Sequence, residues 1–153
     1  MYTAKAFFTN YVLMSTVCAW FVAQFLKMVT TLFKEKKFKP SLMLFSSGGM
    51  PSSHSATVGA LCTSSAIHFG FGSFEFAVSA ILAMVVVTDA MGVRWETGEQ
   101  SKVINKIVKK LFAGNPEDAE TALKELVGHT PLQVLMGVIV GVAIPFVMML
   151  IIK

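Results

Sequence analysis

Four apolar blocks divide this chain, and they constrain its fold more than any other feature. They cover residues 6–29, 54–69, 74–93 and 131–152. A bilayer core of roughly 30 Å needs about 20 helical residues, which the first, third and fourth blocks supply. The chain is 54% hydrophobic and 14% charged, whereas a soluble domain carries about a quarter charged residues. The sequence therefore predicts an all-α, polytopic membrane bundle of about four transmembrane helices, forming a single domain over residues 1–153.

Two of the blocks have alternative interpretations. The second block is short and rich in Ala, Ser, Thr and Gly, which favours a helix packed inside the bundle; a re-entrant or soluble helix is the alternative. For the first block the alternative is a secretory signal peptide. It is longer than a typical signal segment, and it ends in Lys27 rather than at a small-residue cleavage site, so a retained helix is favoured. Cys18 and Cys62 lie in apolar blocks, which indicates buried thiols, with a disulfide as the alternative.

Basic residues gather on two connecting segments. If four helices alternate, residues 30–53 and 94–130 lie on one side, and ten of the thirteen Lys and Arg residues fall there. Because basic loops stay in the cytoplasm, we expect both long loops inside and both termini outside. Within the second loop, apolar residues at helical spacing alternate with lysines over residues 102–111, which predicts a basic amphipathic helix on the cytoplasmic surface. A second short helix is expected between Pro116 and Gly128.

The string Gly-Gly-Met-Pro-Ser-Ser-His-Ser, residues 48–55, leads directly into the second block. Gly and Pro interrupt the chain there, and Ser52 or Ser53 can cap the helix that follows. A helix N-terminus with free backbone N–H groups, two hydroxyls and the His54 imidazole suits an anion. The alternative is an ordinary capped helix start.

A second string, Gly-His-Thr-Pro-Leu-Gln over residues 128–133, opens the fourth block in the same way. Thr130 fits the cap and Pro131 the first helical position. His129 and Gln133 are four residues apart and can share a face. Gly137 and Gly141 extend that face at four-residue steps, which predicts a close helix-packing surface.

The chain has three histidines, and two of them stand at these helix starts. His68, at the far end of the second block, is interpreted as structural. Histidine can act as nucleophile and as general acid, and nearby cations can stabilise charge on a phosphoryl group. The two helix starts, together with cations at helix ends, therefore predict a phosphate site; those cations are Lys27, Lys39 and Arg94.

Three strings together resemble the divergent branch of the type 2 phosphatidic acid phosphatase superfamily, which is related to acid phosphatases and vanadium haloperoxidases. They are GGMPSSHS, DAMGVRWETGEQ and LKELVGHTPLQVLMGVIVG, and the resemblance extends from about residue 20 to 141. It implies that His129 is the nucleophile, that His54 protonates the leaving oxygen, and that no metal or cofactor is needed. It also implies a set of phosphate-binding residues, namely Lys27, Lys39, Ser52, Ser53 and Arg94.

The sequence also departs from the pattern of typical members. Ser53 stands where typical members have glycine, and Lys39 stands where they have arginine before the proline, here Pro40. The gap between Arg94 and His129 is long, whereas in typical members it is a few residues. Gln133 takes the place of the aspartate that orients the histidine; an amide can orient an imidazole but cannot stabilise its cation as a carboxylate does. Asp89 is the candidate for a substitute carboxylate.

The predicted function is that of a membrane lipid-phosphate phosphatase acting at the cytoplasmic face. The expected partners are a lipid-phosphate substrate and membrane lipids, with no nucleic acid, and the small-residue faces also allow a homo-oligomer. Gln133 favours one alternative, a non-catalytic protein that binds or transports lipid phosphates, whereas the pair His54 and His129 favours the enzyme. A structural membrane subunit is a third interpretation, but it leaves the two similar helix starts unexplained.

Overall fold

The computed structural model describes residues 4–35, 49–111 and 130–151, and within these residues it contains helices and no strand. The short helix α1 (Ala4–Phe8) precedes α2 (Tyr11–Glu35), and α4 (Ser53–Phe69) is joined by a tight turn to α5 (Phe74–Met91). The last two helices are α6 (Val93–Leu111) and α7 (Pro131–Ile151). The predicted all-α class is confirmed. Lys39, His129 and the predicted helix between Pro116 and Gly128 lie outside the described residues.

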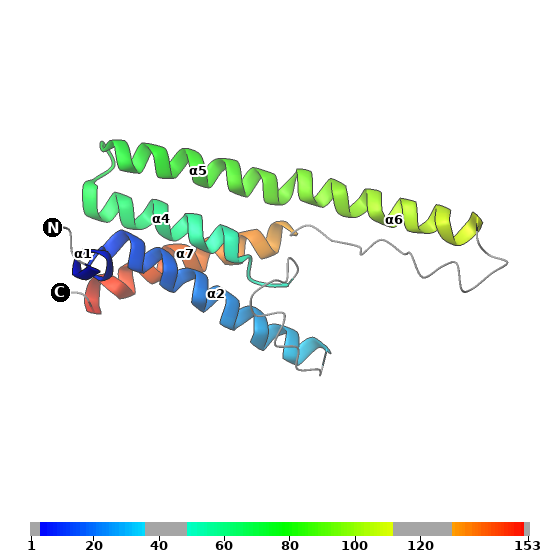
Figure 1. The fold of residues 1–153 in the computed structure, drawn as a ribbon, viewed down its shortest axis with the longest axis horizontal. Coiled ribbons are helices and arrows are strands. Elements are labelled where there is room, and N and C mark those ends of the chain that lie inside the picture. The colour runs from blue at the N-terminus through cyan, green and yellow to red at the C-terminus, as the bar shows by residue number, and fades with distance from the viewer. Residues whose placement is uncertain (1–3, 36–48, 112–129, 152–153) are drawn as a thin grey trace.

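Helix α4 forms the centre of the bundle and packs against α2, α5 and α7 (Figure 1). Its buried positions carry mostly small side chains, and α2 presents Ala19 and Ala23 at 0% exposure on its inner face. Small residues let helix backbones approach closely, which is how helices associate where lipid offers no hydrophobic driving force. The second apolar block is therefore an interior helix, as its composition predicts.

Three helical stretches are long and apolar enough to cross a membrane: Tyr11–Phe33, Phe74–Val108 and Pro131–Ile151. Large apolar side chains on their outer faces are exposed, among them Phe21, Ile81 and Ile139. Such exposure fits lipid contact, and the membrane character of the chain is confirmed. Helix α4 has 17 residues and is not among these three stretches, so a fourth crossing stays a prediction.

The predicted packing of the glycine face of α7 on the small residues of α4 is confirmed. A Cβ atom added to Gly137 would lie 2.9 Å from the Cβ of Ser55, and one added to Gly141 would lie 2.9 Å from the backbone nitrogen of Ala60. Real Cβ atoms do not approach other atoms so closely without a shift. These two glycines therefore allow α7 to lie directly against α4.

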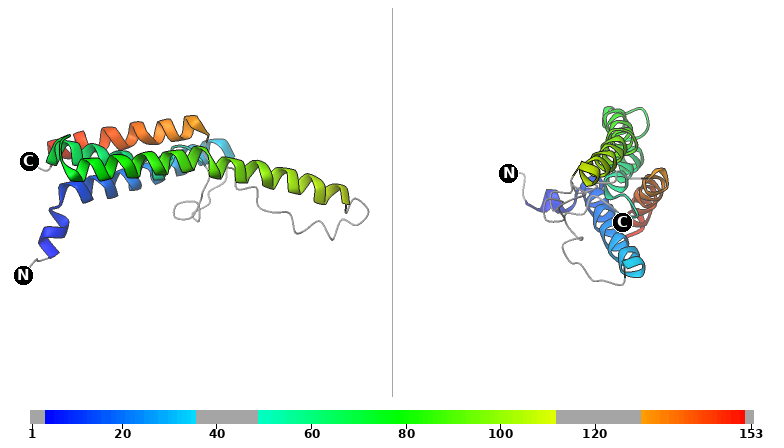
Figure 2. Two further views of the ribbon diagram at one scale, coloured as in Figure 1. Left: turned by 90° about the horizontal axis from the view of Figure 1, so that it is seen from above. Right: turned by 90° about the vertical axis from the view of Figure 1, so that its right-hand side faces the viewer.

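Helix α6 projects beyond the bundle and continues roughly along the direction of α5 (Figures 1 and 2). The two helices are separated at Gly92, whose φ of −95° and ψ of −88° are not helical. The predicted amphipathic helix is present: Val103, Ile104 and Ile107 are exposed on one side of α6. Helix α6 does not lie across the end of the bundle, because the chain continues past Gly92 without a sharp turn.

Candidate functional site

The first candidate region is the start of α4. Ser52 is the N-cap, with φ −68° and ψ 116°, and its Oγ accepts the Ser55 N–H at 3.3 Å and the Ser55 hydroxyl at 2.9 Å. Ser52 is 0% exposed and Ser53 is buried as well. The N–H of Ser53, at the first helical position, has no acceptor within the helix. It is therefore a donor that points out of the positive end of α4.

The second candidate region is the start of α7, where Thr130 and Gln133 form a reciprocal cap. The Thr130 N–H donates to Oε1 of Gln133 at 3.0 Å, and the Gln133 N–H donates to the Thr130 hydroxyl at 3.3 Å. This is a capping box, in which two otherwise unsatisfied N–H groups are paired. Thr130 is thus the cap that the sequence predicts. The oxygen of Gln133, in contrast, serves the helix start, a role that sequence reasoning did not assign to it.

A backbone hydrogen bond joins these two helix starts. The Ser52 N–H donates to the Gln133 carbonyl at 3.0 Å, although the residues are far apart in the sequence. Gly137, one turn further along α7, lies against Ser52 and Ser55. The positive ends of α4 and α7 are therefore side by side, which is the arrangement that the two sequence strings predict. His54 is exposed on the first turn of α4; its meeting with His129 stays a prediction.

Lys27 of α2 reaches the same region. It is only 2% exposed, and a Cβ atom added to Gly49 would lie 3.0 Å from its Cγ and 3.4 Å from its Cδ. Gly49 has φ +103°, a conformation that glycine adopts without strain. Lys27 therefore lies beside the turn before α4, and an ionisable residue inside a membrane bundle is a candidate functional residue.

Two residues that sequence reasoning missed complete this part of the bundle. The Thr30 hydroxyl lies 2.6 Å from the Met50 carbonyl and 2.9 Å from the Lys27 carbonyl, and it ties α2 to the turn before α4. Gln24, one turn before Lys27, is 5% exposed, and its Oε1 has no hydrogen-bond partner among the described residues. The sequence did contain a signal for them, because residues at three-residue steps are neighbours on a helix surface, as Gln24, Lys27 and Thr30 are.

The remaining predicted residues lie at the same end of the bundle. Asp89 is in the last turn of α5, half-buried, beside a shallow groove that Thr88 and Gly92 also line. Arg94 is the second residue of α6, and its side chain is outside what the structure describes. Among the described residues, no three His, Cys, Asp or Glu side chains come together as metal ligands.

Comparisons with known proteins show the family of this chain. A family described as "Divergent PAP2 family" matches this chain over residues 8–144. The chain is 40% identical over 150 residues to a Bacillus subtilis (strain 168) protein described as an uncharacterized membrane protein, YuiD, with 92% of this chain and 94% of that protein covered. No solved structure matches. On the extent of the family match and of this identity, the chain belongs to the Divergent PAP2 family.

Proposed function

We propose that this chain is a membrane lipid-phosphate phosphatase that works through a phosphohistidine on His129 at the cytoplasmic face. The observation that carries the proposal is the hydrogen bond from the Ser52 N–H to the Gln133 carbonyl, because it sets the N-termini of α4 and α7 side by side. Two positive helix ends at one place favour a phosphate group. Membership of the Divergent PAP2 family supports the same reaction class.

The reaction has two steps, as in the superfamily that the sequence resembles. The His129 imidazole attacks phosphorus, the P–O bond to the leaving group breaks, and His54 donates a proton to the leaving oxygen. Water then attacks the phosphohistidine and gives a proton to His54, the P–N bond breaks, and inorganic phosphate leaves. The exposure of His54 on the first turn of α4 supports its role, since the substrate can reach it.

Three cations and one backbone group hold the phosphoryl oxygens in this proposal. Lys27 is buried beside the turn that precedes α4, and the Ser53 N–H has no acceptor within that helix. Lys39 and Arg94 complete the positive charge around the phosphate. Ser52 has a different role in this proposal: its N–H donates to the Gln133 carbonyl and its Oγ accepts from Ser55, so that it holds the two helix starts together.

Gln133 is a positioning residue in this scheme. Its Oε1 accepts the N–H of Thr130, the residue that directly follows His129, and so it holds the start of α7 in place. An amide in this position carries no charge to stabilise an imidazolium. Asp89, at the same end of the bundle, is our candidate for the carboxylate that supplies this charge.

The substrate class follows from the apolar surroundings. Three stretches of the chain can span a membrane, and the candidate site lies at one end of the bundle that they form. A phosphate attached to a lipid reaches such a site by diffusing within the leaflet. Phosphatidate, phosphatidylglycerophosphate and polyprenyl diphosphates all carry the required monoester or diphosphate group.

The test is phosphate release from a panel of these lipids by purified protein. His129→Ala should lower turnover at least about a thousandfold, because the nucleophile is lost. His68→Ala is the matched control: His68 is exposed at the opposite end of α4, next to Phe69, and its loss should leave turnover unchanged. Retention of turnover by His129→Ala would contradict the proposal.

A second function, binding or transport of lipid phosphates without hydrolysis, is favoured by one observation. Gln133 has an amide where a carboxylate is usual, and its oxygen is used in a helix cap. The same panel separates the two functions. Lipid phosphates that bind the wild-type protein tightly and release no phosphate would establish the second.

A further inference from the structure

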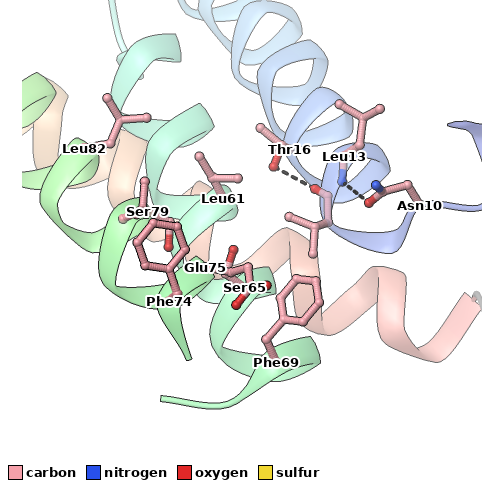
Figure 3. A pocket seen from close by; sticks show the side chains of 12 residues that line it. Asn10, Leu13, Thr16, Leu61, Ser65, Phe69, Phe74, Glu75, Ser79 and Leu82 are labelled. Atoms are coloured by element: carbon pink, nitrogen blue, oxygen red, sulfur yellow. Dashed lines mark hydrogen bonds between the residues drawn. The ribbon is translucent and has the colours of Figure 1, made fainter. Parts of the chain in front are cut away.

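At the end of the bundle opposite the candidate site, a groove of about 580 Å³ lies between α2, α4 and α5 (Figure 3). This volume is within the range of about 300–1,000 Å³ that is typical of ligand sites. Apolar side chains from all three helices line most of it, including Leu13 of α2, Leu61 and Phe69 of α4, and Val78 and Leu82 of α5. We call it the α2/α4/α5 groove.

The α2/α4/α5 groove opens onto a surface of the bundle where large apolar side chains are exposed. Val78 and Leu82 are 47% and 44% exposed, and Phe74 at the rim is 80% exposed. Between Phe74 and Leu82 the α5 wall extends for about 12 Å at the helical rise. An apolar trough of this length, open to the hydrocarbon of a bilayer, suits an extended acyl chain.

Polar groups in the groove are mostly satisfied within their own helices. The Thr16 hydroxyl donates to the Val12 carbonyl at 2.7 Å, and the Ser79 hydroxyl donates to the Phe76 carbonyl at 2.9 Å. The Asn10 side chain accepts the Leu13 N–H at 3.0 Å (Figure 3). These groups do not call for a polar ligand.

The Ser65 hydroxyl and the Glu75 carboxylate are the exceptions among the described residues of the groove. The Glu75 side chain lines the groove near Ser65 (Figure 3), and it is exposed. No described residue forms an ion pair or hydrogen bond with its carboxylate, and no Lys or Arg is among the described residues that line the groove. It lies in the first turn of α5, where the helix dipole favours a negative charge. A carboxylate beside an acyl-chain groove can accept hydrogen bonds from a cationic group on the molecule that fills the groove.

We propose that the α2/α4/α5 groove binds a phospholipid with a primary ammonium headgroup, whose acyl chain lies along α5 and whose ammonium group donates hydrogen bonds to Glu75. A primary ammonium has three N–H donors, whereas the quaternary ammonium of phosphatidylcholine has none, and phosphatidylglycerol brings a net negative charge. This site is at the opposite end of the bundle from the phosphate site, and it does not depend on the proposed phosphatase function.

The test uses native mass spectrometry of the delipidated full chain in detergent, with phosphatidylethanolamine, phosphatidylcholine and phosphatidylglycerol of identical acyl chains in equal amounts. We expect one phosphatidylethanolamine per chain, bound about fivefold more tightly than phosphatidylcholine, as suits one partly exposed, charge-assisted contact. Glu75→Gln should bring the two zwitterionic lipids to nearly equal affinity, because the carboxylate acceptor is lost while the groove remains.

A second pair of variants tests the acyl-chain part. Val78→Trp places a large ring in the groove and should weaken binding of all three lipids. Ile81→Trp is the matched control on the same helix, since Ile81 is 60% exposed and does not line the groove. Equal affinity for the three lipids in the wild-type protein, an unchanged preference in Glu75→Gln, an unaffected Val78→Trp, or a second copy of the chain bound in place of lipid would each overturn the proposal.

Discussion

Replacing Gly137 with alanine tests the contact on which the candidate site depends. The added Cβ would overlap the Ser52 carbonyl oxygen and lie 2.9 Å from the Cβ of Ser55. Both obstacles belong to the first turn of α4, where no flexible side-chain end can move aside. The two helices must therefore separate locally, and the hydrogen bond from the Ser52 N–H to Gln133 is weakened.

The magnitude follows from three contributions. Overpacking a close contact costs about 1–3 kcal/mol, and losing a hydrogen bond costs about 0.5–1.5 kcal/mol. Alanine gains about 1 kcal/mol over glycine within a helix. We therefore expect Gly137→Ala to lower the free energy of unfolding by about 2 kcal/mol, and Gly137→Leu to lower it further.

Gly59→Ala is a matched control in the same interface. A Cβ atom there would lie 3.5 Å from the Cα of Gly141 and 3.5 Å from the Val138 carbonyl oxygen, which is ordinary contact. The helix-propensity gain should then leave this variant as stable as the wild type or up to about 1 kcal/mol more stable. Equilibrium unfolding in mixed detergent micelles, followed by tryptophan fluorescence, measures both changes. If Gly137→Ala and Gly59→Ala unfold alike, α4 and α7 do not pack as the structure has them.

Three further predictions concern other parts of the chain. Cysteines introduced at Lys36 and Lys106 should be labelled by a membrane-impermeant reagent only after the cells are opened, because basic loops stay inside; ready labelling of intact cells would reverse the topology. Thr30→Val should lower the free energy of unfolding by about 1 kcal/mol through loss of the hydrogen bond to Met50, and an unchanged unfolding curve would show that this bond contributes nothing. Gln133→Asp should raise the rate of phosphate release by supplying a carboxylate near His129. Gln133→Ala should lower the stability of the protein, because the cap of α7 is lost. If Gln133→Asp does not raise the rate, another carboxylate, such as Asp89, already stabilises the histidine.

Much of the local structure could be predicted from the sequence, because helix ends depend on neighbouring residues. Ser52 and Thr130 cap the helices that they were expected to cap, since their oxygens reach N–H groups within one turn. The close packing of α4 and α7 was also predictable, because glycines at four-residue steps form one stripe along a helix. The family followed from the strings at those two helix starts together with the string over residues 89–100.

Other features were decided only by the tertiary structure. The helical period tells which residues share a face, but not how far one helix is shifted along its neighbour or which face meets which. That shift sets the Lys27 stem against Gly49 and the Thr30 hydroxyl against the Met50 carbonyl. The same shift leaves a space between α2 and α5 at one end of α4. This space is the α2/α4/α5 groove, which Glu75 lines. Contacts of this kind join residues far apart in the sequence, and no local pattern encodes them.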